Sequence, residues 1–204
     1  MTVRMHRGDL PDLSRFSGSV AIDTETMGLN PHRDRLCLVQ LSSGDGSAEV
    51  VQIPKDHSDA PHLKALLADP NIPKIFHFAR FDLAVLYQTF GVMAQPVYCT
   101  KIASRLSRTY TDRHGLKDLV RELLNIDLSK QQQSSDWGAQ QLNEAQLAYA
   151  ASDVLHLHAL RERLDAMLAR EGRTALAQAC FGFLPTRAWL DLGGWELEDI
   201  FAHS

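Results

Sequence analysis

The sequence has little cysteine and no long hydrophobic run. Its three cysteines (Cys37, Cys99 and Cys180) are far apart and none belongs to a Cys-x-x-Cys pair. An odd number of scattered cysteines argues against a disulfide framework or a zinc site and is typical of reduced thiols. No apolar stretch approaches the roughly 20 residues that a membrane span needs, and the first residues lack the apolar core of a secretory signal. We therefore expect a cytoplasmic protein without membrane contact.

Positive charge is also scarce. The formal net charge of −4 over 204 residues excludes a uniformly basic surface of the kind that holds long nucleic acids. The charge is uneven, however. Five basic residues and one acidic residue lie between Lys101 and Lys117, whereas four acidic residues and no basic residue lie between Asp191 and Ile200. A local anion site is therefore compatible with the composition, and a broad duplex-binding face is not favoured.

Strand-like segments fill the first third of the chain and helical segments fill the rest. Asn143 is a natural N-cap for one long helix that ends before Gly172, and an irregular tail begins at Pro185. Strands before helices favour a single α/β domain over residues 1–204. The hydrophobic pattern predicts strands at 20–23, 34–43, 48–53 and 73–78, and helices at 62–68, 81–90, 100–110, 115–124, 143–171 and 173–184.

Acidic side chains stand at three places where an apolar pattern does not require them. Asp23 and Glu25 end the first apolar strand, and residues i and i+2 of a strand point to the same face, so the two carboxylates repel each other. Asp82 lies at a predicted helix start, and Asp153 lies one helical turn after Tyr149. Carboxylates without matching thiolates or histidines favour Mg²⁺ or Mn²⁺ over zinc. Two such ions roughly 3.5–4 Å apart would make the acids tolerable and would activate a phosphodiester, with the tyrosine orienting a water molecule.

These motifs resemble a known enzyme family. The D-x-E of Asp23 and Glu25, the H-x-A-x-x-D ending at Asp82, and the Y-x-x-x-D ending at Asp153 are similar to the three motifs of DEDD 3′–5′ exonucleases. Ala148 occupies the position of the general base in the histidine subclass, which favours the tyrosine subclass. Longer stretches, including "DTETMGLNPHRDRLCLVQ", "CTKIASRLSRTYTDRHGLK" and "SKQQQSSDW", resemble the nanoRNase C group of ribonuclease D relatives over essentially the whole chain.

The resemblance implies a ribonuclease H-like fold, in which helices flank a mixed central sheet, and hydrolysis from the RNA 3′ end with two metal ions. Asp23 would bridge both ions, Glu25 and Asp153 would hold the ion that activates water, and Asp82 would hold the other. The resemblance also implies very short RNA as substrate, above all dinucleotides such as pGpG, and a homo-octamer.

Substrate-binding residues are less well specified. The resemblance implies that Leu29 wedges between the last two bases, although an ordinary loop leucine would look the same. His77 is a phosphate contact or a core histidine. Further candidates, chosen for charge or hydrogen-bonding capacity, are Thr24, Arg80, Arg108, Arg113, His114, Gln133, Ser134 and Ser135. The alternative is that the basic stretch is a solvated helix face or a subunit contact.

The last twenty residues combine apolar bulk with acidic charge. Seven large apolar residues follow Pro185 in a segment broken by glycines, which is typical of an interface. Its negative charge could face the basic stretch 101–117 of a neighbouring copy. The alternative is a tail that packs on its own domain.

The sequence thus favours a metal-dependent 3′–5′ exoribonuclease that acts on diribonucleotides. A ribonuclease D-type enzyme that trims structured RNA and a DNA exonuclease are the main alternatives. A catalytically idle scaffold would have lost at least one metal-binding acid, and here all four acids and Tyr149 are present.

Overall fold

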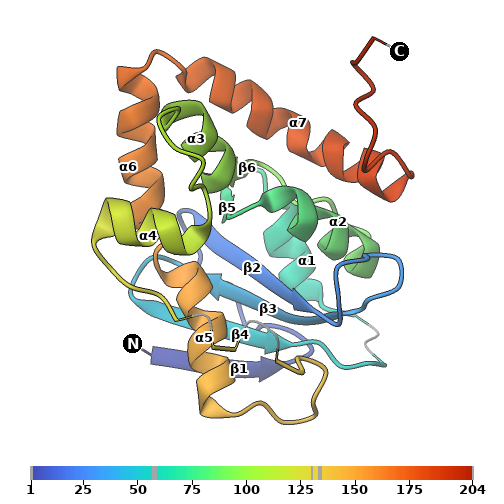
Figure 1. Cartoon of the computed structure of the whole chain (residues 1–204). Helices are drawn as coiled ribbons and strands as arrows, with labels where there is room; N and C mark the ends of the chain where they lie inside the picture. Colours follow the sequence, from blue (N-terminus) through green and yellow to red (C-terminus); the bar gives the residue numbers. More distant parts are fainter. Residues whose placement is uncertain (1, 57–58, 130, 133–134, 204) are drawn as a thin grey trace.

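The central sheet is mixed, and helices complete the fold around it. The computed structural model describes residues 2–56, 59–129, 131–132 and 135–203. Within them, the sheet has the strand order β1-β4-β3-β2-β5-β6 (Figure 1). The strands are β1 (Thr2–Arg7), β2 (Val20–Thr26), β3 (Leu36–Ser42), β4 (Ser47–Gln52), β5 (Lys74–Phe76) and β6 (Val97–Cys99). The helices are α1 (Pro61–Ala68), α2 (Ala79–Phe90), α3 (Thr100–Ser107), α4 (Leu116–Leu124), α5 (Glu144–Leu155), α6 (Leu157–Arg170) and α7 (Thr174–Leu192).

Strand β2 lies in the middle of the sheet and carries the D-x-E motif. It pairs antiparallel with β3 and parallel with β5. Val20, Ala21 and Ile22 are fully buried, as the continuous apolar run of a central strand requires. The register shifts between Glu25 and Thr26, so regular pairing ends directly after the second acid. Such irregularities re-aim side chains and are common beside active sites.

The long helix expected at 143–171 is two helices, and that expectation was wrong. Asn143 does cap α5, in a reciprocal pair of hydrogen bonds with Gln146. At His156, however, regular helical pairing is interrupted, and α6 begins at Leu157 (Figure 1). Helix α5 packs against β2, β3 and β4, whereas α6 packs against α3 and α4. The break therefore lets one half of the segment cover the sheet and the other half cover the neighbouring helices.

The irregular tail expected from Pro185 is also partly wrong, because α7 continues to Leu192. A proline inside a helix removes one hydrogen bond and costs about 3 kcal/mol. Tertiary packing offsets this cost, because Ala177, Phe181, Leu184 and Ala188 form a buried stripe at helical spacing. The helix lies over α3 and α2 (Figure 1). Neither α7 nor any other helix in the described ranges is long and apolar enough to cross a membrane.

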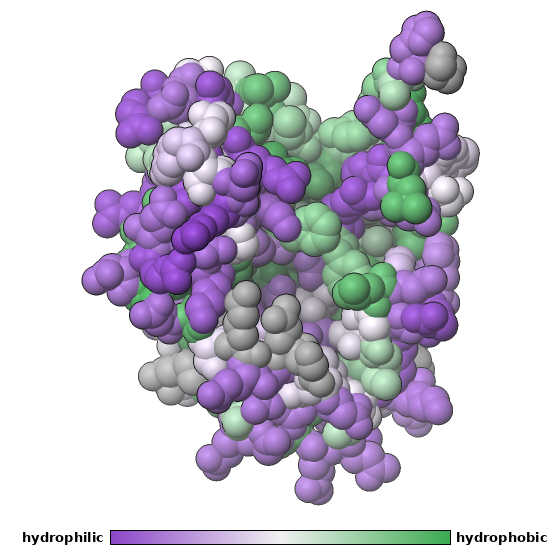
Figure 2. Space-filling model, in the orientation of Figure 1, coloured by the Kyte–Doolittle hydropathy of each residue, from purple (hydrophilic) through white to green (hydrophobic). Residues whose placement is uncertain are grey.

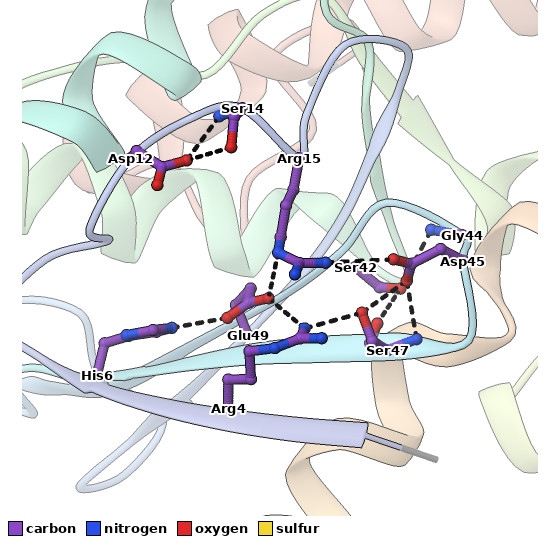
Figure 3. A network of polar contacts seen from close by, with 10 residues as sticks. All are labelled: Arg4, His6, Asp12, Ser14, Arg15, Ser42, Gly44, Asp45, Ser47 and Glu49. Carbon is purple, nitrogen blue, oxygen red and sulfur yellow. Dashed lines mark hydrogen bonds and ion pairs between the residues drawn. The ribbon is translucent and has the colours of Figure 1, made fainter.

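The edge strand β1 was not predicted, because its sequence, "TVRMHR", has little apolar content. It is held to β4 by parallel pairing and by a polar network around Glu49 (Figure 3). Glu49 is only 5% exposed. Its carboxylate accepts a hydrogen bond from Arg4 at 2.8 Å, contacts His6 at 2.7 Å and lies 3.6 Å from Arg15. Charge pairing thus replaces apolar packing at this edge.

Replacing Glu49 by Gln should lower the free energy of unfolding by about 2 kcal/mol, because Arg4 and Arg15 lose the negative charge that they face. Urea denaturation followed by circular dichroism measures this change. The control is Glu171→Gln, an exposed residue paired with its neighbour Arg170, for which we expect less than about 0.5 kcal/mol. Equal effects of the two substitutions would contradict a structural role for the network.

Candidate active site

Three carboxylates from two elements converge beside the centre of the sheet. Asp23 and Glu25 come from β2 and Asp153 comes from α5. One carboxylate oxygen of each lies within 4.8 Å of the others. The α5 residues around Asp153 are small or apolar, and Ala150, Ala151 and Val154 are buried, so the helix approaches the sheet closely and presents its acid to β2.

Asp82 is the fourth acid and is held separately. It lies in the first turn of α2 and is only 4% exposed. Thr24, between the two acids of β2, donates a hydrogen bond from Oγ1 to Asp82 Oδ1 at 2.6 Å. Thr24 is also one of the predicted substrate-binding residues, and its buried side chain positions Asp82. Burial, and then the nearby charge of Asp23, raises the pKa of Asp82 well above its usual range.

Tyr149 lies one turn before Asp153 on the same helix. Its ring packs against the buried Trp137, with ring centroids 6.0 Å apart. Burial and then the nearby carboxylates of Asp153 and Glu25 raise the pKa of the Tyr149 hydroxyl above its usual range. The phenol therefore stays protonated and is available to donate and accept hydrogen bonds beside the acids.

The acidic cluster is electrostatically unfavourable without a counter-charge. Burial raises the pKa of Asp23 to about 7 and that of Asp153 to about 8, and the charge of Asp23 adds to the second shift. Burial, together with the charges of Asp23, Asp153 and Asp82, raises the pKa of Glu25 to about 9. Divalent cations with a preference for oxygen ligands fit this donor set, because they replace the missing counter-charge.

The raised pKa values predict how the stability of the metal-free protein depends on pH. The unfolded acids lose their protons near pH 4, but the folded acids keep them to higher pH, so stability falls as pH rises from about 4 to 9. In EDTA, Asp153→Asn should therefore show a smaller decrease in melting temperature between pH 5.5 and 8.5 than the unmodified chain.

Calorimetry at both pH values makes this measurement, and Mg²⁺ should restore the unmodified chain more strongly at pH 8.5. Comparing the two chains cancels the titration of distant groups. The interpretation fails if the melting temperatures of both chains fall by the same amount over this pH interval.

Gln40 is a residue at this site that the sequence analysis missed. It is fully buried on β3 directly opposite Asp23, so the two side chains share one face of the sheet. Neither polar atom of its side chain has a hydrogen-bond partner among the described residues. A polar residue inside the apolar run "LCLVQL" was the available signal.

A pocket of about 560 Å³ is lined by residues of the segments that follow Glu25 and that lead into Asp82, although none of the four acids lines it. It lies between the loop after β2, the start of α2 and the end of α7. Leu29, which was expected to contact bases, lines it and is 85% exposed. Phe78 also lines it, is 45% exposed, and adopts the left-handed backbone conformation (φ 67°) directly before α2. Hydrophobic residues gather in the recessed centre of the face in Figure 2.

The candidates for phosphate binding are dispersed. Arg80 is engaged by Asp191, at 2.6 and 2.7 Å. Arg108 is fully buried and pairs with Glu122, so it has a structural role. Arg113 is exposed.

The remaining candidates make local contacts or lie outside the described residues. His77 contacts Thr100 Oγ1 at 2.9 Å, and burial followed by the charge of Lys101 lowers its pKa to about 3, so it is a neutral, partnered histidine. His114 contacts Ser104 at 2.8 Å, and Ser135 bonds to Gln132 within its own turn. Gln133 and Ser134 lie outside the described residues.

Comparison with known proteins decides the family. A family model described as 3′–5′ exonuclease matches residues 10–169. The chain belongs to the 3′–5′ exonuclease family. This exonuclease is 38% identical over 154 residues to ribonuclease D of Gluconacetobacter diazotrophicus, covering 76% of this chain. It spans only 39% of the length of that relative.

Solved structures give the exonuclease a narrower placement. It is 62% identical to Brucella melitensis NrnC with bound Mg²⁺, with a TM-score of 0.97 and full coverage of both chains. The same NrnC bound to pGG matches at 63% identity, also with full coverage and a TM-score of 0.97. Escherichia coli RNase D matches at 28% identity and a TM-score of 0.75, over 90% of this chain and 50% of that one. The exonuclease is thus NrnC-like, and the expected ribonuclease H-like fold of the DEDD exonucleases is confirmed.

Proposed function

We propose that this exonuclease is a metal-dependent exoribonuclease that hydrolyses very short RNA, chiefly dinucleotides such as pGpG, to nucleoside monophosphates from the 3′ end. The observation that carries the proposal is the full-length likeness to an NrnC whose structure contains pGG. The three clustered carboxylates give the chemistry a location in this chain. Cellular RNA decay would then be completed by this activity in the cytoplasm.

The metal ligands in this proposal are Asp23, Glu25, Asp82 and Asp153. The donor set fits two Mg²⁺ or Mn²⁺ ions, because all four ligands are carboxylates. Their raised pKa values show that burial disfavours the charged forms when no cation is present. Bound ions would supply charge neutralisation at the scissile phosphate and a more acidic water molecule.

The remaining chemistry is assigned to the side chains around the acids. The protonated hydroxyl of Tyr149 orients the attacking water, since it lies on the helix face that carries Asp153. Thr24 fixes the carboxylate of Asp82. Leu29 projects from the loop after β2 and separates the last two bases of the substrate.

Turnover with Mg²⁺ on 5′-labelled RNAs of two and seven nucleotides tests the proposal. We expect the dinucleotide to be consumed at least about tenfold faster, because a pocket closed around the 5′ phosphate would fit two nucleotides and exclude a longer RNA. Asp23→Ala is the blank and should lose all activity. Equal or faster shortening of the longer RNA would instead identify a general ribonuclease D-like trimming enzyme, and preferential attack on DNA would identify a DNA exonuclease.

We also propose that the chain self-associates through its last residues, in the homo-octamer expected for this group. Trp195, Leu197, Ile200 and Phe201 are between 42% and 95% exposed at the end of the described chain, which is unusual for large apolar residues. Phe201 packs on Phe183, in the middle of α7, with ring centroids 6.0 Å apart, so the last described residues return to this helix.

Size-exclusion chromatography with light scattering measures this association. The triple change Leu197→Ser, Ile200→Ser and Phe201→Ser leaves α7 complete and should dissociate the oligomer into smaller species. Leu176→Ser, at an exposed leucine near the start of α7, is the matched control. An unchanged mass of the triple variant would refute the interface.

A further inference from the structure

The segment 191–196, here called the C-terminal hook, reverses the chain after α7. Gly194 has a positive φ of 96°, which allows the sharp turn. The N–H of Trp195 then donates to Leu190 O at 2.9 Å, as in a helix-ending motif. The Trp195 ring lies over Gly193, where an added Cβ would approach it to 2.6 Å. The hook is therefore a defined turn.

Two arginines hold the hook, Arg80 from α2 and Arg187 from α7. Asp191 accepts Arg80 Nε at 2.6 Å and Nη2 at 2.7 Å, and it accepts Arg187 Nε at 2.9 Å and Nη2 at 2.6 Å. The same guanidinium groups donate to main-chain carbonyls of the hook. Arg80 reaches Glu196 O at 2.7 Å, and Arg187 reaches Trp195 O. Arg80 pairs with both carboxylate oxygens of Asp191, and a bidentate pair of this kind fixes orientation as well as position.

The clamped hook is one wall of the pocket between the loop after β2 and the start of α2. Asp191, Leu192 and Glu196 line one side, while Leu29 and Phe78 line the other. Phe81, also in the lining, directly precedes Asp82 in α2, and Leu29 lies four residues after Glu25, so the segments that border the pocket also carry catalytic acids. The volume of about 560 Å³ lies in the range of small-ligand sites, roughly 300–1,000 Å³.

The lining suits a nucleobase of the substrate. Aromatic and aliphatic side chains offer flat apolar contact, and the carbonyls and carboxylates at the rim accept hydrogen bonds from exocyclic amino groups. Lys101 Nζ lies 4.4 Å from the centre of the Phe78 ring and so adds positive charge beside this lining residue, where it would attract a phosphate.

We infer that Arg80, Asp191 and Arg187 are positioning residues that hold the C-terminal hook as a wall of the nucleotide pocket, and that the hook sets the affinity for short RNA. This inference rests on the proposed function. Arg80 then has a structural role in the pocket, and other groups would bind the phosphate of the substrate.

The test compares Asp191→Asn with the unmodified full-length chain. Two substrates are used: pGpG, and bis(4-nitrophenyl) phosphate, a phosphodiester without a nucleobase. We expect KM for pGpG to rise about tenfold with a much smaller change in kcat, because a wall of the binding site loses its fixed position. The ratio of kcat/KM for pGpG to that for bis(4-nitrophenyl) phosphate should fall by a similar factor. Asp191→Glu, which keeps the charge, should recover part of the affinity.

Glu198→Gln is the matched control, since Glu198 is an exposed acid that follows the hook and does not line the pocket. It should leave both substrates unaffected. If Asp191→Asn does not fold, Arg187→Gln makes the same test while keeping the Arg80–Asp191 pair, with an expected increase in KM of about threefold.

An unchanged KM for pGpG, or a parallel loss on both substrates, would overturn the role of the hook. Failure of the proposed function gives a different result. In that case the unmodified chain would cleave bis(4-nitrophenyl) phosphate but not pGpG.

Discussion

Mutual repulsion among buried carboxylates is the constraint on which this structure depends. Asp23, Glu25 and Asp153 are forced within a few ångströms of one another, and burial keeps their pKa values high. Folding must supply enough apolar packing around β2 and α5 to hold them there. The fully buried Val20, Ala21 and Ile22 at the start of β2, and the alanines of α5, provide that packing. The site is thus a local destabilisation maintained by the surrounding core.

The rest of the fold places this cluster at an opening. The break at His156 allows α5 to lie on the sheet while α6 and α7 pass over the other helices. Helix α7 then returns the chain to α2, where Tyr87 and Trp189 meet edge to face with ring centroids 6.2 Å apart. Residues from the start of α2 and the end of α7 consequently share a pocket with the loop that follows β2.

Much of the site could be predicted from the sequence, because its signals are local. Acids two apart on a strand, and Tyr149 four residues before Asp153, share a face by simple periodicity. The roles of Thr24 and Arg80 could not be predicted, because they depend on partners far along the chain: Asp82 for the first, and Asp191, 111 residues away, for the second.

Parts of the fold escaped prediction for a related reason. Strand β1 is stabilised by the buried Glu49, which in the sequence only interrupts an apolar run. The helix break at His156 is not marked in the sequence by a glycine or a proline. Helix α7 continues through Pro185 because of packing that only the tertiary structure supplies. Local propensity was outweighed in each case by contacts between distant segments.

Phe78 illustrates how function limits the improvement of such a fold. A bulky residue in the left-handed region costs roughly 1–3 kcal/mol, and glycine would adopt the same backbone without that cost. An engineer ranking positions for thermostability would therefore choose Phe78→Gly early, yet the change would remove an aromatic side chain from the lining of the pocket. Stability and activity make opposite demands at this one position. Directed evolution for heat resistance should be run with a selection for turnover, or this side chain will be among the first to be lost.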